Sequence, residues 1–413
     1  MTAAPRRIAV FTSHPIQYQA PLFRELASRP GLDVTVFFGS RHGVEQAFDP
    51  GFGASFRWDV PLLEGYRHVF LENRAPRPDV SSFRGVRVPE IRRHWRPGAF
   101  DAALVLGWQT LGHLQAMRAA WSAGIPLVIR GESNLAMRPD SSAKARLRAA
   151  LWVPLRTRIY RKVFSRAAAF LTIGSRNAEY YRHFGVPERR MYRAPYCVEN
   201  ERFALPAPRR SEARARVRGA LGVGEGTVVF TSAAKLVAKK RPFDLLEAFA
   251  ALAAAERDVH LVYLGDGPER GAVEERVRRA ELTGRVTVSG FVNQAEIPDW
   301  YAASDALVLP SDTMETWGLV VNEAMAAGLP VIVSDAAGCA PDLVREGENG
   351  FTFSCGDVSA LADRMARLAE LLPEERESMG SRSRQIVSGF TVAHVADALL
   401  RALDDVLHST EVS

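Results

Sequence analysis

Short apolar runs alternate with helix-forming segments along this chain, and the alternation occurs in two series. The first series has apolar runs at residues 7–11, 32–38, 102–106, 126–129 and 170–173. The second series has them at residues 227–231, 260–264, 285–288, 305–309, 331–333 and 350–353. Strands that alternate with helices in this way form a parallel sheet covered by helices. The sequence therefore predicts an α/β protein with two doubly wound domains that face each other across a cleft.

The length of 413 residues agrees with two domains, because a single hydrophobic core stops growing at about 250–300 residues. We expect an N-terminal domain at residues 1–200 and a C-terminal domain at residues 201–389. Residues 204–226 combine prolines, glycines and charges, which is typical of a domain boundary. A last helix at about residues 390–410 is expected to pack back on the first domain.

The composition narrows the class of protein. A hydrophobic content of 47% and a charged content of 24% indicate a folded globular chain. Three widely spaced cysteines without a CxxC pair predict neither disulfides nor a zinc site. The chain shows no signal-peptide pattern and no apolar run near the roughly 18 residues that span a bilayer. We therefore expect a cytoplasmic protein that at most lies on a membrane surface.

Residues 141–166 hold eight basic residues and no acidic one, interleaved with apolar side chains such as Trp152 and Ile159. A basic amphipathic helix is typical of contact with anionic lipid. However, the charges are poorly segregated from the apolar positions, and Pro154 interrupts a helix. Two interpretations remain: a solvated basic helix of the first domain, and a surface for anionic lipid or a lipid-linked acceptor.

Two glutamates, Glu315 and Glu323, flank a helix start that follows the apolar run at residues 305–309. A loop carboxylate and a helix carboxylate at such a joint can bind polyhydroxylated groups. The exposed N–H groups between them can bind phosphate. The alternative is a pair of solvated carboxylates that the helix dipole favours at this end.

Cations and glycines follow two other strands of the second domain. Lys235 and Lys240 come directly after the run at residues 227–231, so they are expected to point into the cleft and neutralise a diphosphate. Gly265 and Gly267 lie in a strand-to-helix turn, where glycine permits close approach of the backbone to a ligand. The alternatives are a solvated lysine cluster and an ordinary turn. Neither GxGxxG nor GxxxxGK occurs, which disfavours nicotinamide-dependent and ATP-hydrolysing enzymes.

The first domain supplies candidates for binding an acceptor. Ligands bind at the carboxyl ends of parallel strands. His14, Gln17 and Tyr18 follow the first apolar run, and Glu132 follows the run at residues 126–129. The alternatives are a loop cap for His14 and a buried hydrogen-bond partner for Glu132.

Together, these motifs resemble the family 4 retaining glycosyltransferases, which share the two-Rossmann-domain architecture called GT-B. The matching segments cover roughly residues 190–390, and they lie at residues 234–240, 265–268, 290–292, 310–332 and 338–350. The first domain matches only in outline. Lys235 stands where the family has an arginine, which keeps the charge and loses the bidentate geometry.

The resemblance implies a role for each matched residue. Glu323 would bind the donor ribose, and Glu315 would face the transferred sugar. The backbone N–H groups from Met314 to Gly318 would assist Glu315. The implied catalytic residues are Glu315, Lys240, Lys235 and, from its place in the first domain, His14. The implied donor-binding residues are Glu323, Gly265, Gly267, Phe291, Val292, Thr316, Trp317, Gly318, Leu319 and Val320.

The resemblance implies a hexosyltransferase-like enzyme that acts in cell-surface polysaccharide biosynthesis. It would transfer a sugar from a UDP- or GDP-linked donor to a glycan or lipid-linked acceptor, with retention of configuration. No cofactor and no nucleic acid are expected, and the lack of a DxD pair of aspartates predicts a metal-independent reaction. The protein would be cytoplasmic and peripheral on the inner face of the membrane. Alternatives are a sugar-nucleotide epimerase or hydrolase on the same fold, and a non-catalytic nucleotide-sugar-binding protein.

Overall fold

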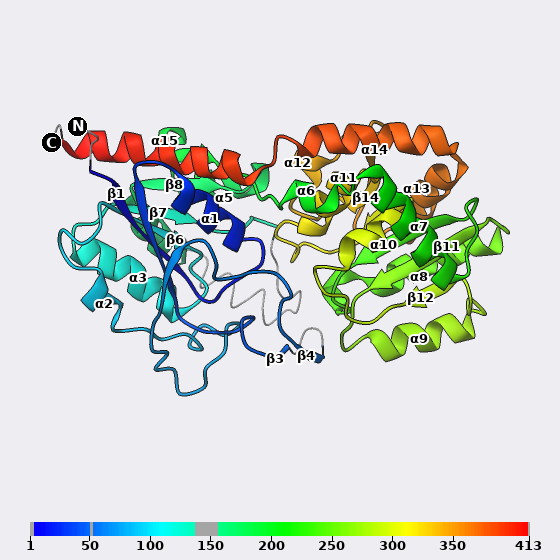
Figure 1. The fold of residues 1–413 in the computed structure, drawn as a ribbon, viewed down its shortest axis with the longest axis horizontal. Helices are drawn as coiled ribbons and strands as arrows, with labels where there is room; N and C mark the ends of the chain where they lie inside the picture. Colours follow the sequence, from blue (N-terminus) through cyan, green and yellow to red (C-terminus); the bar gives the residue numbers. More distant parts are fainter. Residues whose placement is uncertain (1–3, 50–52, 137–155, 412–413) are drawn as a thin grey trace. The chain divides into compact units, whose positions relative to one another are not determined.

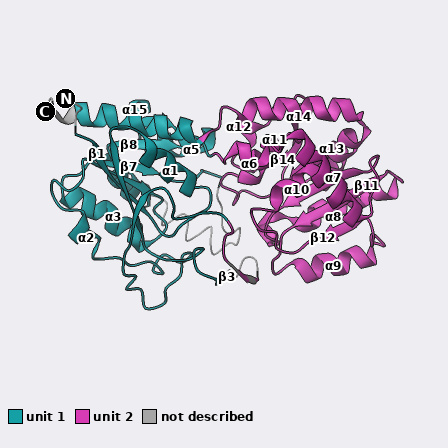
Figure 2. Cartoon of the chain, in the orientation of Figure 1, with its two compact units in different colours: residues 1–47, 60–196, 392–413 teal, residues 48–59, 197–391 magenta. Residues whose placement is uncertain are grey.

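The computed structural model describes residues 4–49, 53–136 and 156–411, which form two compact units (Figure 2). Unit 1 contains residues 1–47, 60–196 and 392–413, and unit 2 contains residues 48–59 and 197–391. The boundary expected after residue 200 therefore lies after residue 196. Residues 48–59, expected in the first domain, belong to unit 2.

Unit 1 is built on a seven-stranded parallel sheet with the strand order β5-β2-β1-β6-β7-β8-β9 (Figure 1). The strands are β1 (Arg6–Thr12), β2 (Leu32–Phe38), β5 (Arg67–Phe70), β6 (Ala102–Leu106), β7 (Leu127–Arg130), β8 (Ala169–Thr172) and β9 (Met191–Arg193). The helices are α1 (Ala20–Ser28), α2 (Ile91–His94), α3 (Leu111–Ser122), α5 (Ser175–His183), the short 3-10 helix η1 (Glu188–Arg190) and α15 (Val392–Glu411). Residues 156–165 are also helical.

Unit 2 is built on a six-stranded parallel sheet with the order β12-β11-β10-β13-β14-β15. The strands are β10 (Val228–Ala233), β11 (Val259–Leu264), β12 (Val286–Val288), β13 (Ala306–Leu309), β14 (Val331–Ser334) and β15 (Gly350–Phe353). The helices are α6 (Asn200–Phe203), α7 (Ala207–Leu221), the 3-10 helix η2 (Ala238–Lys240), α8 (Pro242–Ala254), α9 (Arg270–Arg279), α10 (Ile297–Ala303), α11 (Leu319–Ala327), α12 (Ala340–Leu343), α13 (Val358–Glu370) and α14 (Pro373–Val387). A separate pair, β3 (Ala47–Asp49) and β4 (Ala54–Phe56), forms its own small sheet.

Helices on both faces explain why the central strands are apolar throughout rather than alternating. All of β6, β10, β11 and β13 is buried. Each unit has its own core cluster, which includes Phe11, Trp95 and Phe170 in unit 1 and Phe230, Phe249 and Met365 in unit 2. The continuous apolar runs of the sequence therefore correspond to strands that are covered on both faces.

The strand order reverses beside β1 in unit 1 and beside β10 in unit 2. In a parallel sheet, the loops on either side of such a reversal leave the carboxyl ends of the strands in opposite directions, and ligands bind there. In unit 2 these are the loops that follow β10 and β13, at residues 234–241 and 310–318. The topology thus brings together the lysine segment and the first of the two glutamates.

Residues 204–226, predicted as a domain boundary, instead contain the 15-residue helix α7, which packs on α10 within unit 2. The sequence hides this helix because its buried face is not purely apolar. Arg218 is 1% exposed, forms an ion pair of 3.1 Å with Asp305 and donates to the Ala303 carbonyl. A buried arginine satisfied in this way replaces the apolar stripe that helix prediction relies on.

Helix α15 returns the end of the chain to unit 1, where it packs on α1, β8 and β9. Its buried residues include Val395, Leu399, Ala402 and Leu403. The stretch from Pro373 to His408 meets the length and hydropathy of a membrane span, with a mean hydropathy of 1.4 over a window that is 44% buried. The structure divides this stretch, since α14 ends at Val387 and α15 begins at Val392.

Candidate functional site

Lys240 and Glu315 meet at the strand-order reversal of unit 2. Lys240 ends η2 in the loop after β10, and its Nζ forms a hydrogen-bonded ion pair with Glu315 Oε2 from the loop after β13. Both side chains are mostly covered, at 16% and 13% exposed. The sequence predicted a diphosphate contact for one and a sugar contact for the other. It did not predict that they bind each other.

Burial opposes ionisation of Glu315, but the neighbouring charges prevail. The charge and hydrogen bond of Lys240, followed by the charge of Lys239, hold the pKa of Glu315 below its ordinary value. Glu315 is therefore a carboxylate at neutral pH, and it keeps the Lys240 ammonium in place. The Lys240 charge is thus paired with a carboxylate at the end of this loop.

The loop before α11 uses part of its own backbone. The N–H of Met314 donates to the Asp312 carboxylate at 2.8 Å, and the N–H of Glu315 donates to the Asp312 carbonyl at 3.0 Å. The expectation that N–H groups from Met314 onward assist a ligand is therefore wrong for these two residues, because the loop needs them to hold its turn. The N–H groups of Leu319 and Val320 lie in the first turn of α11. N–H groups in a first turn have no carbonyl acceptor within their own helix.

Three predicted residues at this joint, Gly318, Trp317 and Thr316, make close packing or hydrogen-bond contacts within unit 2. Gly318 has a φ of 104°, and a Cβ there would lie 2.6 Å from Leu309 Cδ2, so only glycine fits before α11. Trp317 is 2% exposed, and its indole Nε1 donates to Asn322 Oδ1 at 2.8 Å. The Trp317 ring is thus part of the core. Thr316 packs against Gly338, where a Cβ would lie 1.8 Å from the Thr316 carbonyl oxygen.

Glu323 lies inside α11 and has the opposite electrostatic situation to Glu315. It is 7% exposed, and its Oε2 accepts a hydrogen bond of 2.9 Å from the Tyr301 hydroxyl of α10. Burial raises the pKa of Glu323 to about 7, against the smaller opposing effects of the Tyr301 hydrogen bond and the Arg202 charge. The sequence did not single out Tyr301. A tyrosine in a short apolar helix carries no signal of its own until the tertiary fold brings it to a carboxyl group.

Gly265 and Gly267 pack against the lysine segment rather than standing open. A Cβ on Gly265 would lie 2.0 Å from the Ala234 carbonyl oxygen, and one on Gly267 would lie 2.5 Å from that of Leu236. Two backbone hydrogen bonds, from Leu236 to Asp266 and from Glu269 to Leu236, join the same two loops. These glycines therefore fix the segment that carries Lys235, which is half-buried. A direct contact with a donor stays a prediction for both glycines.

Phe291 lies beside a segment that the sequence had assigned elsewhere. Its ring centroid is 6.4 Å from that of Trp58, in the part of unit 2 formed by residues 48–59. Asn293 Nδ2 donates to the Arg57 carbonyl at 3.0 Å in the same region. Val292 follows and is half-buried. Trp58 is thus a further aromatic candidate that linear spacing did not reveal.

The candidates of unit 1 form two groups at the carboxyl edge of its sheet. His14 Nδ1 lies 2.9 Å from Ser13 Oγ, and its ring lies edge-on to His42 at 5.3 Å. Tyr18 and Glu132 meet through Tyr196: the Tyr18 and Tyr196 rings are 5.7 Å apart, and the Tyr196 hydroxyl donates to Glu132 Oε1. Gln17 is half-buried in the turn before α1.

Two residues that the sequence did not identify complete this second group. The Arg130 guanidinium lies 4.7 Å from the centre of the Tyr196 ring, and the Arg130 side chain is 6% exposed. Burial, and after it the Glu132 charge, raises the pKa of Tyr196 well above its ordinary value. Tyr196 is therefore a neutral hydroxyl that can only donate to the Glu132 carboxylate. Tyr196 follows β9, a strand that the sequence analysis did not predict.

The basic segment at residues 141–166 falls partly on residues 137–155, which lie outside the described residues. In the described part, residues 156–165 are helical, and Arg156, Arg158, Arg161 and Lys162 are exposed. Phe164 packs into the core of unit 1. The solvated basic helix and the lipid-contacting surface both agree with this pattern, so the choice stays open here.

No group of three or more His, Cys, Asp and Glu side chains in the described ranges is placed to hold a metal ion. All three cysteines, Cys197, Cys339 and Cys355, lie in unit 2, and none of them forms a disulfide.

A family model described as glycosyl transferases group 1 matches residues 214–386. These residues lie within unit 2 and include every candidate residue that the sequence predicted there, from Lys235 to Glu323. N-acetyl-alpha-D-glucosaminyl L-malate synthase of Bacillus anthracis is 32% identical over 167 residues, which are 40% of this chain and 42% of that protein. The 2-deoxystreptamine glucosyltransferase of Streptomyces kanamyceticus is 29% identical over 321 residues, which are 77% of this chain and 80% of that protein. The match to the first relative thus spans less than half of its length.

Among solved structures, HepE of Anabaena in complex with UDP and glucose is similar to this chain with a TM-score of 0.69 and 20% sequence identity. The similarity covers 96% of this chain and 99% of HepE. It confirms the fold class predicted from the alternation of strands and helices, which is that of the GT-B architecture.

Proposed function

We propose, for a chain whose residues 214–386 match the model of the group 1 glycosyl transferases, the transfer of a sugar from a nucleotide-diphosphate donor to a glycan or lipid-linked acceptor. The observation that carries the proposal is the Lys240–Glu315 ion pair at the strand-order reversal of unit 2. A phosphate-binding cation and a sugar-binding carboxylate at one loop junction suit a donor that contains both groups. The UDP bound to HepE and the names of the glycosyltransferase relatives support this class of donor.

The proposed chemistry separates charge at the glycosyl–phosphate bond. When the bond breaks, negative charge develops on the diphosphate and positive charge at the anomeric carbon. Lys240, Lys235 and the first-turn N–H groups of α11 would stabilise the diphosphate. Glu315 would lie on the sugar side once the diphosphate takes over part of its bond to Lys240. Removing one preorganised donor of this kind commonly lowers the rate by about a hundredfold.

Glu323 would accept hydrogen bonds from the donor ribose, with its carboxyl group held by Tyr301. The Tyr18, Tyr196 and Glu132 group of unit 1, together with His14 and Gln17, would contact the acceptor. Retention of configuration, independence of metal and a role in cell-surface polysaccharide synthesis follow from the family resemblance and are part of the proposal. Peripheral contact with the inner face of the membrane through residues 141–166 is also part of it.

A thermal-shift screen with UDP-, GDP-, ADP- and dTDP-sugars identifies the donor, because bound donor raises the stability with the logarithm of its excess. Turnover of that donor is then measured with and without acceptor mixtures. We expect Lys240→Ala to reduce turnover at least about tenfold, since it removes a donor aimed at the leaving group. The control is Lys239→Ala, which removes the same charge from the adjacent, exposed side chain and retains most of the rate.

Equal rates for Lys240→Ala and wild type would contradict the leaving-group role. Donor consumption that needs no acceptor would instead indicate an epimerase or hydrolase, and donor binding without turnover would indicate a binding protein. Loss of activity in EDTA that manganese restores would refute independence of metal.

A further inference from the structure

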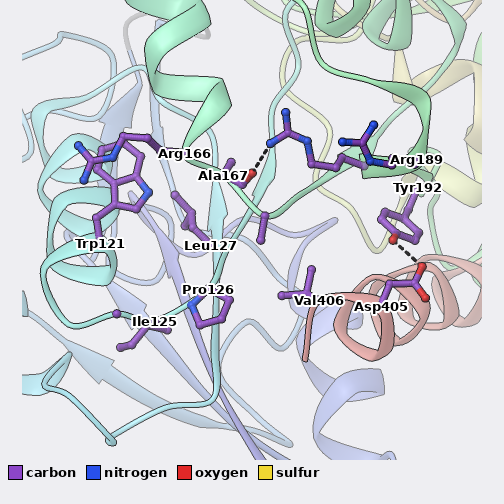
Figure 3. A pocket seen from close by; sticks show the side chains of 13 residues that line it. Trp121, Ile125, Pro126, Leu127, Arg166, Ala167, Arg189, Tyr192, Asp405 and Val406 are labelled. Atoms are coloured by element: carbon purple, nitrogen blue, oxygen red, sulfur yellow. Dashed lines mark hydrogen bonds between the residues drawn. The ribbon is translucent and has the colours of Figure 1, made fainter. Parts of the chain in front are cut away.

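Unit 1 contains a pocket of about 540 Å³ on the edge of its sheet opposite the candidate acceptor residues (Figure 3). Its floor is the chain that enters β7 and β8, with Ile125, Pro126 and Leu127 on one side and Ala167 on the other. The end of α3 and the side of α15 close it. We call it the amino-end pocket, because the residues at its base precede their strands instead of following them.

Three arginines give the amino-end pocket its charge. Arg166, Arg189 and Arg190 line it, together with one carboxylate, Asp405. Asp405 Oδ2 already accepts a hydrogen bond of 2.6 Å from the Tyr192 hydroxyl (Figure 3). Across the described ranges, none of the three arginines has an ion pair with a carboxylate. The lining of the pocket thus holds more cations than anions, and among the described residues these three cations form no ion pair with a carboxylate.

The arginines are held at different depths. Arg190 is anchored through Nη1, which donates to the Ala167 carbonyl at 2.8 Å. Arg166 lies over the Trp121 ring, with its Cζ 4.5 Å from the ring centre. Arg189 extends at the rim and is exposed. One guanidinium is therefore fixed in the wall, and two stand where an entering anion can contact them.

Two hydrogen-bond donors of the lining remain without an acceptor. Arg190 Nε and Trp121 Nε1 are buried, and neither has a hydrogen-bond partner in the part of the chain that the structure describes. A buried donor left unpaired is destabilising, so such groups are uncommon in folded proteins. Burial, and after it the charge of Arg189, lowers the pKa of Arg190. An anion bound beside Arg190 would offset the repulsion from Arg189.

We propose that the amino-end pocket binds a small phosphate-bearing ligand, with the phosphate at one or more of the arginines that line it and an apolar portion on the floor. Arginine favours phosphate because its planar guanidinium donates two parallel hydrogen bonds. The apolar floor, formed by Ile125, Pro126, Leu127 and Val406, gives the pocket room for a group larger than phosphate. The pocket lies in unit 1 and shares no residue with the donor site proposed in unit 2.

The same phosphate chemistry is found in soluble phosphate esters and in the headgroup of an anionic phospholipid. Arg166 ends the basic segment, whose helical part at residues 156–165 exposes further cations. The proposed ligand is therefore a phosphate ester. The experiment distinguishes a soluble ester from the headgroup of an anionic phospholipid.

The first arm uses the full-length protein labelled with ¹⁵N at the indoles of its seven tryptophans. The Trp121 signal is assigned with Trp121→Phe, and phenyl phosphate and inorganic phosphate are titrated. We expect the Trp121 signal to shift with saturation by phenyl phosphate. The variant R166A/R189A should bind about tenfold more weakly or worse, because each lost arginine removes a charge-assisted hydrogen bond. The other tryptophan signals report that the fold is intact.

The matched control is R92A/R93A, which removes two adjacent, exposed arginines of α2 in the same unit. It should bind phenyl phosphate with the wild-type affinity. The variant Arg189→Lys should bind with an affinity between wild type and R166A/R189A, since it keeps the charge and loses the bidentate geometry. Equal affinities for R166A/R189A and R92A/R93A would overturn the proposal, because general surface charge would then explain the binding.

The second arm measures co-sedimentation with vesicles of phosphatidylcholine that contain phosphatidylglycerol. Retention that R166A/R189A abolishes and R92A/R93A leaves unchanged would assign the site to a lipid headgroup. A Trp121 shift with phenyl phosphate and no such retention would assign it to a soluble ester. No Trp121 shift together with no variant-sensitive retention would refute the site.

Discussion

At the scale of single residues, the two glutamates of the opening motif have opposite surroundings. Glu315 is paired with Lys240, so its pKa lies below the ordinary value in spite of burial. Glu323 is buried beside the Tyr301 hydroxyl, so its pKa rises to about 7. The spacing of the two residues placed both near the start of α11, but it contained no information about these partners. Their difference suits the proposed roles, since one holds a cation and the other binds hydroxyl groups.

The raised pKa of Glu323 makes stability depend on pH. Between its ordinary value of 4.5 and about 7, the folded state holds a proton that the unfolded state has lost. Stability therefore falls as the pH rises from about 4.5 to about 7, by on the order of 3 kcal/mol from the size of the shift, and changes no further above that. We expect Glu323→Gln, which can still accept from Tyr301, to raise the melting temperature at pH 8.5 and to leave it unchanged at pH 4.5.

The control for this prediction is Glu374→Gln, at an exposed position of α14. Its melting temperature should follow wild type at both pH values. If Glu323→Gln melts like wild type at pH 8.5, the buried carboxyl does not titrate as its surroundings indicate. Glu323→Gln should also bind the nucleotide donor more weakly than wild type. An unchanged donor affinity, measured by calorimetry, would refute the assignment of Glu323 to the ribose.

At the scale of elements, the loops of unit 2 support one another. The turn at Gly265 and Gly267 lies against the backbone of residues 234–236, and hydrogen bonds join the two. The sequence pattern identified the turn and the lysine segment correctly as neighbours of a strand end. Their contact with each other follows from the pairing of β10 with β11, which no linear pattern contains.

We expect Gly265→Ala to destabilise unit 2 by more than roughly 2 kcal/mol, because the new Cβ would lie 2.0 Å from the Ala234 carbonyl oxygen and the backbone must move. Donor affinity should fall as well, since the displaced loop carries Lys235. The measurement is urea unfolding, with Gly271→Ala as the matched control. Gly271 lies in α9 with nothing within 4 Å of the added Cβ, so alanine should stabilise by about 0.5–1 kcal/mol. Similar midpoints for both variants would show that the turn is not tightly packed.

At the scale of the whole molecule, each unit draws on distant parts of the chain. Unit 1 needs α15 from the end of the chain, and unit 2 needs residues 48–59 from its first part. The sequence analysis expected the last helix to pack back on the first domain, and α15 contacts α1, β8 and β9 there. It assigned residues 48–59 to the first domain, because a short segment without periodicity carries no information on which core it joins.

Two buried leucines test this division. Leu403 on α15 and Leu361 on α13 are both fully buried, in unit 1 and unit 2 respectively. Each Leu→Ala change should cost about 2–5 kcal/mol through lost burial and a cavity. Hydrogen exchange measured by mass spectrometry should show lost protection mainly in β8, β9 and α1 for Leu403→Ala, and mainly in α8 and β15 for Leu361→Ala. Loss spread equally over both units in either variant would contradict two separate cores.

The sequence by itself determined the fold class, most strands and the positions of the glycine, lysine and glutamate motifs at strand ends. Strands buried on both faces must be continuously apolar, and glycines, lysines and glutamates at strand ends remain visible as patterns. It failed at α7, where ion pairs replace the apolar stripe, and at the strand that leads to Tyr196. Only the tertiary structure decided which side chains are partners: Lys240 with Glu315, Tyr301 with Glu323, and Tyr196 with Glu132. Along the chain, the partners are 75, 22 and 64 positions apart, respectively. Their burial and charge exist only once strand order has brought the loops together, because a local pattern records neighbours along the chain and not neighbours in space.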